Sequence, residues 1–452
     1  MKLQRFFLIS TAVMLLCSSI NGQNAPRQWT LEECIRYAIA NNINLKQSEQ
    51  NKESKKIELN TAKNSWLPNL NINGSQSFGF GRSQSRDGTI VDQNSAGTSM
   101  GIQTGMPLFD GFRILNNIAA GKLNLKAATE SLNKAKEDLA IGVASYYLQA
   151  LYCKELFKIA EMQVNLTKEQ VANTEVMVEV GKVAMSQLFD IKAQLATDEV
   201  TLVETGNRVS LAMLDLIQIL ELERLGDDFD IVQPEIDNAI ADYMQSMMLP
   251  DLIYDGAVLF KPQIKEQEYL LERQKKLLRV ARANYYPQLN LSAEYRNGYY
   301  SYFGGENTEK AKPFSDQFKQ NAQRNIGVSL SIPVFNRFSY RNNVRQAKAG
   351  LINQQLTMED SKKTLYKEIQ QAYFNATAEQ EKFIASEKSV AASQEALMYA
   401  EERYKAGKST VFEYNESKTK YATSLSQQAQ AKYNFIFRAK ILDFYNGVEI
   451  KL

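Results

Sequence analysis

The sequence predicts a mainly α-helical protein that also contributes four transmembrane β-strands, with one structural plan used twice. The first observation is the segment 101–113, which alternates apolar and polar residues, meets a proline and then opens a long helical pattern. A close copy of it begins 226 positions later and covers 327–339. The second observation is a Gly-Lys pair that interrupts a long helical pattern in each half, at the same spacing. A duplication of this length predicts two structurally equivalent halves.

The composition restricts the classes of function. The chain has 452 residues, with 44% hydrophobic and 23% charged side chains, which excludes a disordered protein. The formal net charge is only +2, so we expect no nucleic-acid partner. Histidine is absent, which removes the usual general base and the commonest zinc ligand. Cys17, Cys34 and Cys153 are too far apart in the sequence for a metal cluster or a disulfide framework. We therefore expect no cofactor and no metal.

Residues 1–22 have the pattern of a secretory signal peptide. Two basic residues precede an apolar stretch at 6–17, and small residues follow it. The stretch is too short to span a bilayer as a helix, and no later stretch reaches that length. Lipidation at Cys17 is an alternative, but Leu16 is a poor match to the small residue expected there, which favours simple cleavage. The mature chain is exported, and strands must make any bilayer crossing.

Local patterns set the expected boundaries. Thr30 and Glu33 form the sequence pattern of a capping box and predict a helix start. We expect a first repeat over 23–225, with strands at about 67–80 and 98–108 and a hairpin tip near 181. An equatorial connector follows over 226–262. We expect a second repeat over 263–452, with strands at about 287–300 and 325–333 and a hairpin tip near 407. We expect loops over 81–97 and about 301–323.

The four expected strands alternate apolar and polar residues. In an exported protein, alternating segments of about ten residues are typical of transmembrane β-barrels. A soluble sheet with one wet face would explain any single strand. Aromatic residues flank the strands at both ends, as in membrane-interface girdles: Trp66, Tyr285 and Tyr286 at one end, and Phe78, Phe80 and Tyr299 at the other. Four strands cannot close a barrel, and open edges cannot face lipid, so several copies must combine. This argument leaves two, three or four copies possible.

Each strand-to-helix turn contains a proline and a capping residue. Pro107 and Pro333 suit the last strand position, because proline cannot donate to a sheet ladder. Asp110 and Asn336 follow as expected helix N-caps. The long helices that start there show coiled-coil periodicity with many small seam residues. Several such hairpins, leaving one end of a barrel, would form a tubular wall in the periplasm.

These features together resemble the TolC-like outer-membrane efflux protein family, also called outer membrane factors. The resemblance rests on Pro-Leu-Phe-Asp at 107–110, Pro-Val-Phe-Asn at 333–336, the two Gly-Lys breaks, the duplication and the strand placement. It implies a homotrimer with a twelve-stranded outer-membrane barrel continuous with a periplasmic helical tunnel. It also implies passive export in a tripartite efflux or type I secretion system, with a periplasmic adaptor and an inner-membrane transporter of RND, ABC or MFS type.

The resemblance also implies functional residues at the hairpin tips. Adaptor docking is expected at the two Gly-Lys breaks: Gly181, Lys182, Gly407 and Lys408. The segment 404–416 is similar to the family's closed tunnel tip, where carboxylates often stand at the positions of Glu413 and Glu416. Residues three apart on a helix share a face. In a trimer they would form two rings of three carboxylates, which would attract cations.

Other residues of the expected constriction are Tyr404 and, in the first half, Gln187 and Asp190. The chain departs from the family at Ser409, where some members have an arginine that helps to hold the tip closed. The simpler interpretation is that Glu413 and Glu416 are ordinary solvated helix residues and that Tyr404 only packs.

Two other functions compete with the channel. An exported coiled-coil protein that spaces envelope layers would explain the helices and the leader, but not four alternating strands. An enzyme is disfavoured, because the sequence has no G-x-S-x-G motif, phosphate loop or metal-ligand cluster. The acidic pair Asp227-Asp228 falls in the connector, where solvation is its expected role. The sequence does not identify the exported substrate or the pump.

Overall fold

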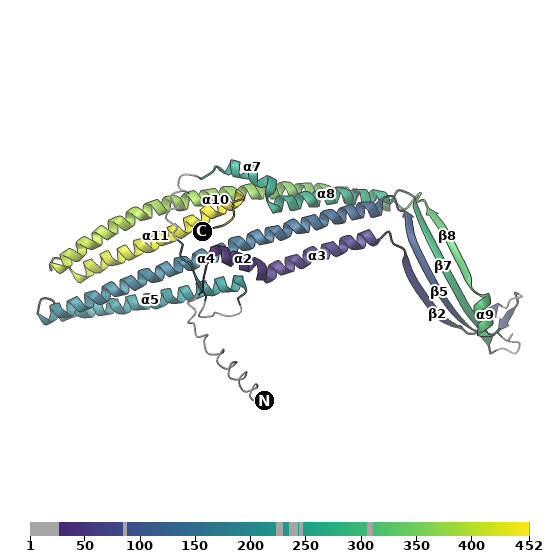
Figure 1. Ribbon diagram of the computed structural model, residues 1–452, viewed down its shortest axis with the longest axis horizontal. Helices are drawn as coiled ribbons and strands as arrows, with labels where there is room; N and C mark the ends of the chain where they lie inside the picture. Colours follow the sequence, from purple (N-terminus) through teal and green to yellow (C-terminus); the bar gives the residue numbers. More distant parts are fainter. Residues whose placement is uncertain are drawn as a thin grey trace, which may run out of the picture. The chain divides into compact units, whose positions relative to one another are not determined.

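The computed structural model describes residues 27–84, 88–222, 229–234, 243, 247–304 and 311–451. The predicted signal peptide, Cys17 and the Asp227-Asp228 pair lie outside these residues. The chain divides into two compact units, shown together in Figure 1: unit 1 is Met1–Ser48, Leu132–Lys261 and Lys362–Leu452, and unit 2 is Glu49–Ser131 and Pro262–Ser361. Each unit takes segments from both halves of the sequence.

Unit 2 contains a four-stranded antiparallel sheet, in the order β2-β5-β7-β8 (Figure 1). Its strands are β2 (Asn69–Gly79), β5 (Asn94–Phe109), β7 (Gln288–Phe303) and β8 (Gln323–Ser331). The prediction of four strands is therefore confirmed. Each half pairs its own two strands, β2 with β5 and β7 with β8, and the structure joins the two halves through β5 and β7, a pairing that the sequence pattern does not predict.

The regions expected as loops contain further elements, so the loop prediction is wrong there. A small hairpin of β3 (Arg82–Gln84) and β4 (Ile90–Asp92) lies between β2 and β5. The short helix α9 (Phe314–Gln320) lies between β7 and β8. Gly, Ser and Asn dominate 94–99, but these residues extend β5: all of them pair with β7, and 95–99 also pair with β2. Pairing with neighbours overrode the low strand propensity of these residues.

The helices account for most of the chain. They are α2 (Leu31–Asn41), α3 (Ile43–Asn64), α4 (Arg113–Glu179), α5 (Met185–Leu220), α7 (Pro250–Phe260), α8 (Pro262–Ala283), α10 (Ser339–Lys405) and α11 (Val411–Tyr445). The Thr30 capping box is confirmed: the Glu33 N–H donates to Thr30 Oγ1 at 3.2 Å, and the Thr30 N–H donates to Glu33 Oε2 at 3.2 Å. Helices α4 and α5 form one hairpin, and α10 and α11 form the other (Figure 1). Across the described ranges, every helix is too short or too polar to span a membrane.

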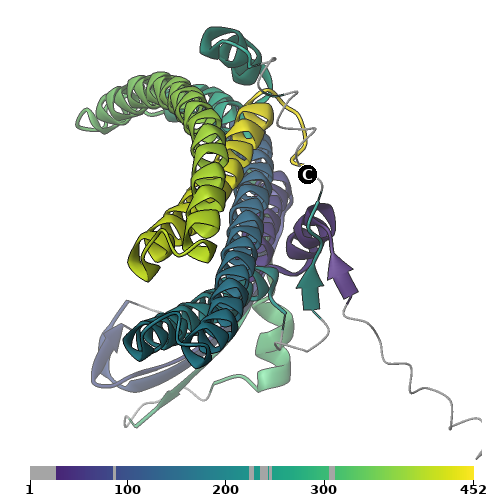
Figure 2. The ribbon, with the colours of Figure 1, turned by 90° about the vertical axis from the view of Figure 1, so that its left-hand side faces the viewer.

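The core of unit 1 lies where the helices meet a small parallel sheet. Strands β1 (Arg27–Trp29) and β6 (Phe229–Ile231) lie side by side in Figure 2. The Tyr147 hydroxyl lies 3.1 Å from the Trp29 carbonyl oxygen and 2.8 Å from that of Val232, which fixes α4 to both strands. Buried apolar side chains from α2, α4, α5 and α11 complete the cluster: Cys34, Ala38, Leu151, Leu216 and Phe435.

Candidate functional site

The sheet has one apolar and one polar face. Ile72 is paired with Ile102, which is paired with Tyr295, and Leu291 is paired with Val328. Because paired residues lie on the same face of a sheet, the apolar sets of all four strands fall together. This face carries Leu70, Ile72, Phe78, Met100, Ile102, Leu289, Leu291, Ile326, Val328 and Leu330. The opposite face carries Asn71, Asn73, Ser75, Gln103, Asn290, Ser292, Asn325 and Ser329.

The turn from β5 into α4 needs an unusual backbone. Gly111 and Phe112 have φ of 68° and 66°, in the left-handed region. A Cβ on Gly111 would lie 2.5 Å from the Ala283 carbonyl oxygen, so this position requires glycine. In the second half, Arg337 and Phe338 adopt φ of 55° and 59° before α10 begins. The two turns are therefore conformational copies with different residues.

The prolines and capping residues of these turns differ in detail. Pro107 lies within β5, opposite Asn290, beside a register shift, whereas Pro333 follows the end of β8. Asp110 is buried, and its Oδ2 accepts the Ile114 N–H at 2.9 Å, in the first turn of α4. For Asn336 the structure gives only a backbone bond, in which the Ser339 N–H donates to its carbonyl at 3.1 Å.

The two hairpin turns are also copies of each other. Gly181 and Gly407 have φ of 71° and 68°. The Lys182 N–H donates to the Met177 carbonyl at 2.8 Å, and the Lys408 N–H donates to the equivalent Arg403 carbonyl at 2.9 Å. These bonds satisfy carbonyls at the helix end, as in a Schellman motif. Both lysine side chains are exposed beside the turns.

Glu413 forms part of the start of α11. The Glu413 N–H donates to Thr410 Oγ1 at 3.2 Å, and the Ser409 hydroxyl donates to Glu413 Oε2 at 2.6 Å. Arg403 lies 3.8 Å from the same carboxylate oxygen. The bonds from Ser409 and the Thr410 N–H, with a smaller effect of Arg403, hold the pKa of Glu413 below its ordinary value. Ser409 therefore contacts the acidic tip directly.

The other predicted constriction residues are distributed over three helices. Glu416 and Asp190 are exposed, and Gln187 is half-buried at the start of α5. Tyr404 stacks on Tyr414, with ring centroids 5.3 Å apart, and its hydroxyl lies 3.1 Å from Thr174 Oγ1 on α4. Among the described residues, no hydrogen bond or ion pair joins the acidic positions of α11 to Gln187 or Asp190. Tyr404 thus links the two hairpins.

A buried ion pair, missed by sequence reasoning, also links the hairpins. Lys418 on α11 has no exposed surface, and its Nζ lies 3.4 Å from Asp198 Oδ2 on α5. It also donates to Thr167 Oγ1 on α4 at 2.5 Å, and the Thr167 hydroxyl bonds the Asp198 carboxylate. Burial lowers the pKa of Lys418, and the nearby Asp198 charge opposes that shift. Three helices therefore meet at one charge pair.

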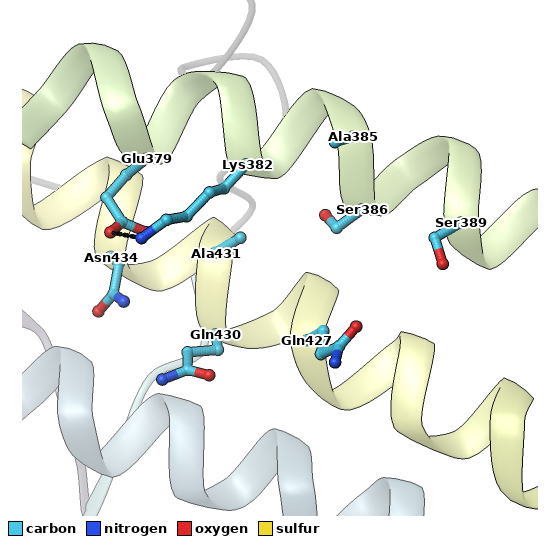
Figure 3. Close-up of a pocket in the computed structure, with 9 residues that line it drawn as sticks. All are labelled: Glu379, Lys382, Ala385, Ser386, Ser389, Gln427, Gln430, Ala431 and Asn434. Carbon is cyan, nitrogen blue, oxygen red and sulfur yellow. Dashed lines mark hydrogen bonds and ion pairs between the residues drawn. The ribbon is translucent and has the colours of Figure 1, made fainter.

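An open groove runs between α10 and α11 (Figure 3). It has a volume of about 430 Å³ and is lined by small and polar side chains. Ser386 and Ser389 come from α10, and Gln427 and Gln430 come from α11 (Figure 3). The Lys382 ammonium lies 2.7 Å from the Glu379 carboxylate at one end. The groove therefore combines hydrogen-bonding side chains with the apolar surface of Ala385 and Ala431.

Comparisons with known proteins agree with this architecture. The family model described as outer membrane efflux protein matches residues 34–220 and 254–442. Outer membrane protein TolC of Escherichia coli is 22% identical over 434 residues, which cover 94% of this chain and 83% of TolC. The alkaline protease secretion protein AprF of Pseudomonas aeruginosa is 19% identical, covering 79% of this chain and 70% of AprF.

Solved structures share the fold. A crystal structure of CusC, a protein described as forming a transmembrane channel, superposes with a TM-score of 0.76 at 17% identity and covers 95% of this chain and 96% of its own. The family model spans both halves of the sequence, including most of α4, α5, α10 and α11. The chain belongs to the outer membrane efflux protein family.

Proposed function

We propose that three copies of this chain form an outer-membrane channel that is the exit duct of a tripartite efflux or type I secretion system. Substrates are delivered by an inner-membrane transporter of RND, ABC or MFS type through a periplasmic adaptor, and they leave passively. The observation that carries this proposal is the single apolar face across four strands, on a sheet whose outer strands, β2 and β8, each pair with one strand among the described residues.

The sheet edges argue for assembly. In the described chain, β2 pairs only with β5, and β8 pairs only with β7. In a bilayer, each unpaired backbone N–H or C=O costs several kcal/mol, roughly, because lipid offers no hydrogen bonds. Pairing β8 of one copy with β2 of the next gives each of these outer strands a second partner, and three copies give twelve strands. The apolar face then contacts lipid and the polar face lines the pore.

The helical hairpins supply the periplasmic part of the duct. We assign the constriction to rings of Glu413 and Glu416, with Gln187, Asp190 and Tyr404 contributing. Repeated carboxylates in a narrow passage favour cations. We assign the adaptor contact to the exposed turns that contain Lys182 and Lys408. No catalytic step is assigned to the chain.

Two arginine substitutions on neighbouring residues of β8 test the membrane assignment. Val328 lies on the apolar face and Ser329 on the polar face, so Ser329→Arg is the matched control for Val328→Arg. An arginine facing lipid near the bilayer midplane costs about 2–4 kcal/mol, whereas one in the pore costs little. We expect Val328→Arg to reduce trimers in the outer-membrane fraction, and Ser329→Arg to leave them intact and alter conductance.

Equal tolerance of both substitutions would contradict the membrane assignment. In that case the chain would be better described as a coiled-coil protein that spaces envelope layers.

A further inference from the structure

The short helix α9 takes the place of a strand partner beside the upper part of β7. Strand β8 begins at Gln323, opposite Arg296, so residues 297–303 of β7 have no partner on that side of the sheet. The Tyr300 N–H donates to Gln317 Oε1 at 3.0 Å, and Gln317 Nε2 donates to the Tyr300 carbonyl at 2.7 Å. The primary amide of Gln317 therefore reproduces the two bonds of a strand neighbour.

Two more side-chain amides fasten α9 to β7. Asn297 Nδ2 donates to the Phe318 carbonyl at 2.7 Å, and Asn321 Nδ2 donates to the Gly298 carbonyl at 2.7 Å. Asn297 is only 2% exposed and Gln317 only 9% exposed. Because the amides of Asn297 and Gln317 are buried and paired, α9 is held rigidly on the sheet.

The position of α9 relative to the two faces follows from the strand register. Asn297 pairs with Met100 and Tyr299 pairs with Thr98, so both lie on the apolar face. Both contact α9: Asn297 through its amide, and Tyr299 through the Phe314 ring, with centroids 5.6 Å apart. The helix therefore covers the polar side chain of Asn297, which would otherwise interrupt the apolar face.

The outer surface of α9 is aromatic. The Phe314 and Phe318 rings stack, with centroids 5.4 Å apart, and remain 56% and 40% exposed. Lys312 and Lys319 are exposed beside them, with Asp316 the one exposed acid of the helix. Aromatic rings next to cationic side chains suit the boundary between hydrocarbon and headgroups.

We propose that α9 is a lipid-interface anchor, whose Phe314 and Phe318 insert among the headgroups of the outer leaflet at the end of the sheet away from the helices. This inference rests on the proposed function, since it needs the apolar face to contact lipid. The partner is a lipid surface rather than a neighbouring copy, because the rings continue the apolar face through Tyr299. The sequence predicted a loop here, so this anchor adds to the predicted girdle.

Site-directed spin labelling tests the anchor. Single cysteines replace Phe314 or Phe318 in the full-length trimer, are labelled with a nitroxide, and are reconstituted into vesicles of phosphatidylethanolamine and phosphatidylglycerol. The native Cys34 and Cys153 are buried and serve as the unlabelled background. Accessibility to oxygen, which concentrates in lipid, is compared with accessibility to a water-soluble nickel chelate. We expect an oxygen-to-nickel ratio several-fold higher than at Tyr302→Cys, which lies on the opposite face.

A label at Val328→Cys distinguishes failure of the α9 anchor from failure of the proposed channel. If labels at 328 and 318 both report lipid, the anchor is supported. If 328 reports lipid and 318 reports water, the anchor is wrong while the channel stands. If the label at 318 is poorly accessible to both oxygen and the nickel chelate while the label at 328 reports lipid, a neighbouring copy covers α9 and the lipid assignment is wrong. If the label at 328 reports water, the proposed function is wrong.

The variant Gln317→Leu tests how the anchor is held. Leucine cannot donate to the Tyr300 carbonyl or accept its N–H, so α9 should detach, and the label at 318 should lose its lipid signature while the label at 328 keeps it. An unchanged signal at 318 would show that the amides do not position the rings.

Discussion

Lys418 and Asp198 join the two hairpins through a charge pair that has almost no contact with solvent. Replacing Lys418 with methionine keeps much of the side-chain volume but leaves the Asp198 carboxylate buried without its cation. Breaking a buried pair in this way costs about 3–5 kcal/mol, whereas removing both charges is often neutral. We expect Lys418→Met to lower the unfolding midpoint of the trimer clearly, and Lys418→Met/Asp198→Leu to recover most of the loss.

The exposed Lys420, two residues further along α11, supplies the control: Lys420→Met should leave the midpoint near that of the wild type. A single variant as stable as the wild type would show that the pair does not hold the hairpins together.

Glu413 gives the start of α11 a dependence on pH. Its pKa is lower in the folded protein, because Ser409 and the Thr410 N–H donate to the charged form. A lowered pKa contributes stability above the unfolded pKa, and this contribution is lost as pH falls through the folded pKa. We expect the protection of backbone amides in the first turn of α11 against hydrogen exchange to decrease as the pH falls from the unfolded pKa of Glu413 through its folded pKa. Glu413→Gln keeps a capping side chain but does not titrate, so it should show a flatter profile. Identical profiles would contradict the capping role.

At the scale of elements, the hairpin turns are set by backbone conformation rather than by space. A Cβ on Gly407 would meet nothing within 4 Å, yet its φ is 68°. We expect Gly407→Ala to destabilise the protein by about 1 kcal/mol, because an L-residue is strained in this region. Gly256 in α7 is equally open but has no positive φ, so Gly256→Ala should be neutral or stabilising in the same thermal unfolding assay. Similar effects at both positions would exclude the backbone explanation.

The exposed lysines beside the turns test adaptor docking. We expect Lys182→Glu/Lys408→Glu to abolish export while leaving trimers intact, because the charge reversal alters the proposed contact surface and no buried group. Lys388→Glu reverses an exposed charge along α10, away from the turn, and should export normally. Export is measured in cells that carry the cognate pump and adaptor. Loss of trimers in the double variant, or normal export from it, would contradict a docking role.

The sequence predicted the elements that have strong periodicity. Four strands, two long hairpins and the Thr30 cap followed from alternation, glycine breaks and capping chemistry. Helix α9 did not, because seven residues within a polar region give too short a helical pattern to recognise. The Lys418 and Asp198 pair was also missed, because charged residues on a helix are exposed by default and only tertiary packing buries them. Strand order likewise depends on pairing between distant segments.

At the scale of the whole molecule, the central claim is that copies of this chain enclose a pore with an acidic inner constriction. The claim depends on three features. Closure of the sheet encloses the pore, the polar strand face lines it, and the carboxylates near the α10–α11 turn form the constriction. The same assembly would place the outer edges of β2 and β8 against each other, which explains why no strand of the described residues pairs with either edge.

Single-channel conductance of the purified protein in a planar bilayer tests this claim most directly. We predict discrete, cation-selective openings, and a larger or less selective conductance for Glu413→Ala/Glu416→Ala. A pore unchanged by that double substitution would retain the channel but place its constriction elsewhere. Well-folded, membrane-extracted trimers that give no conductance would contradict the account.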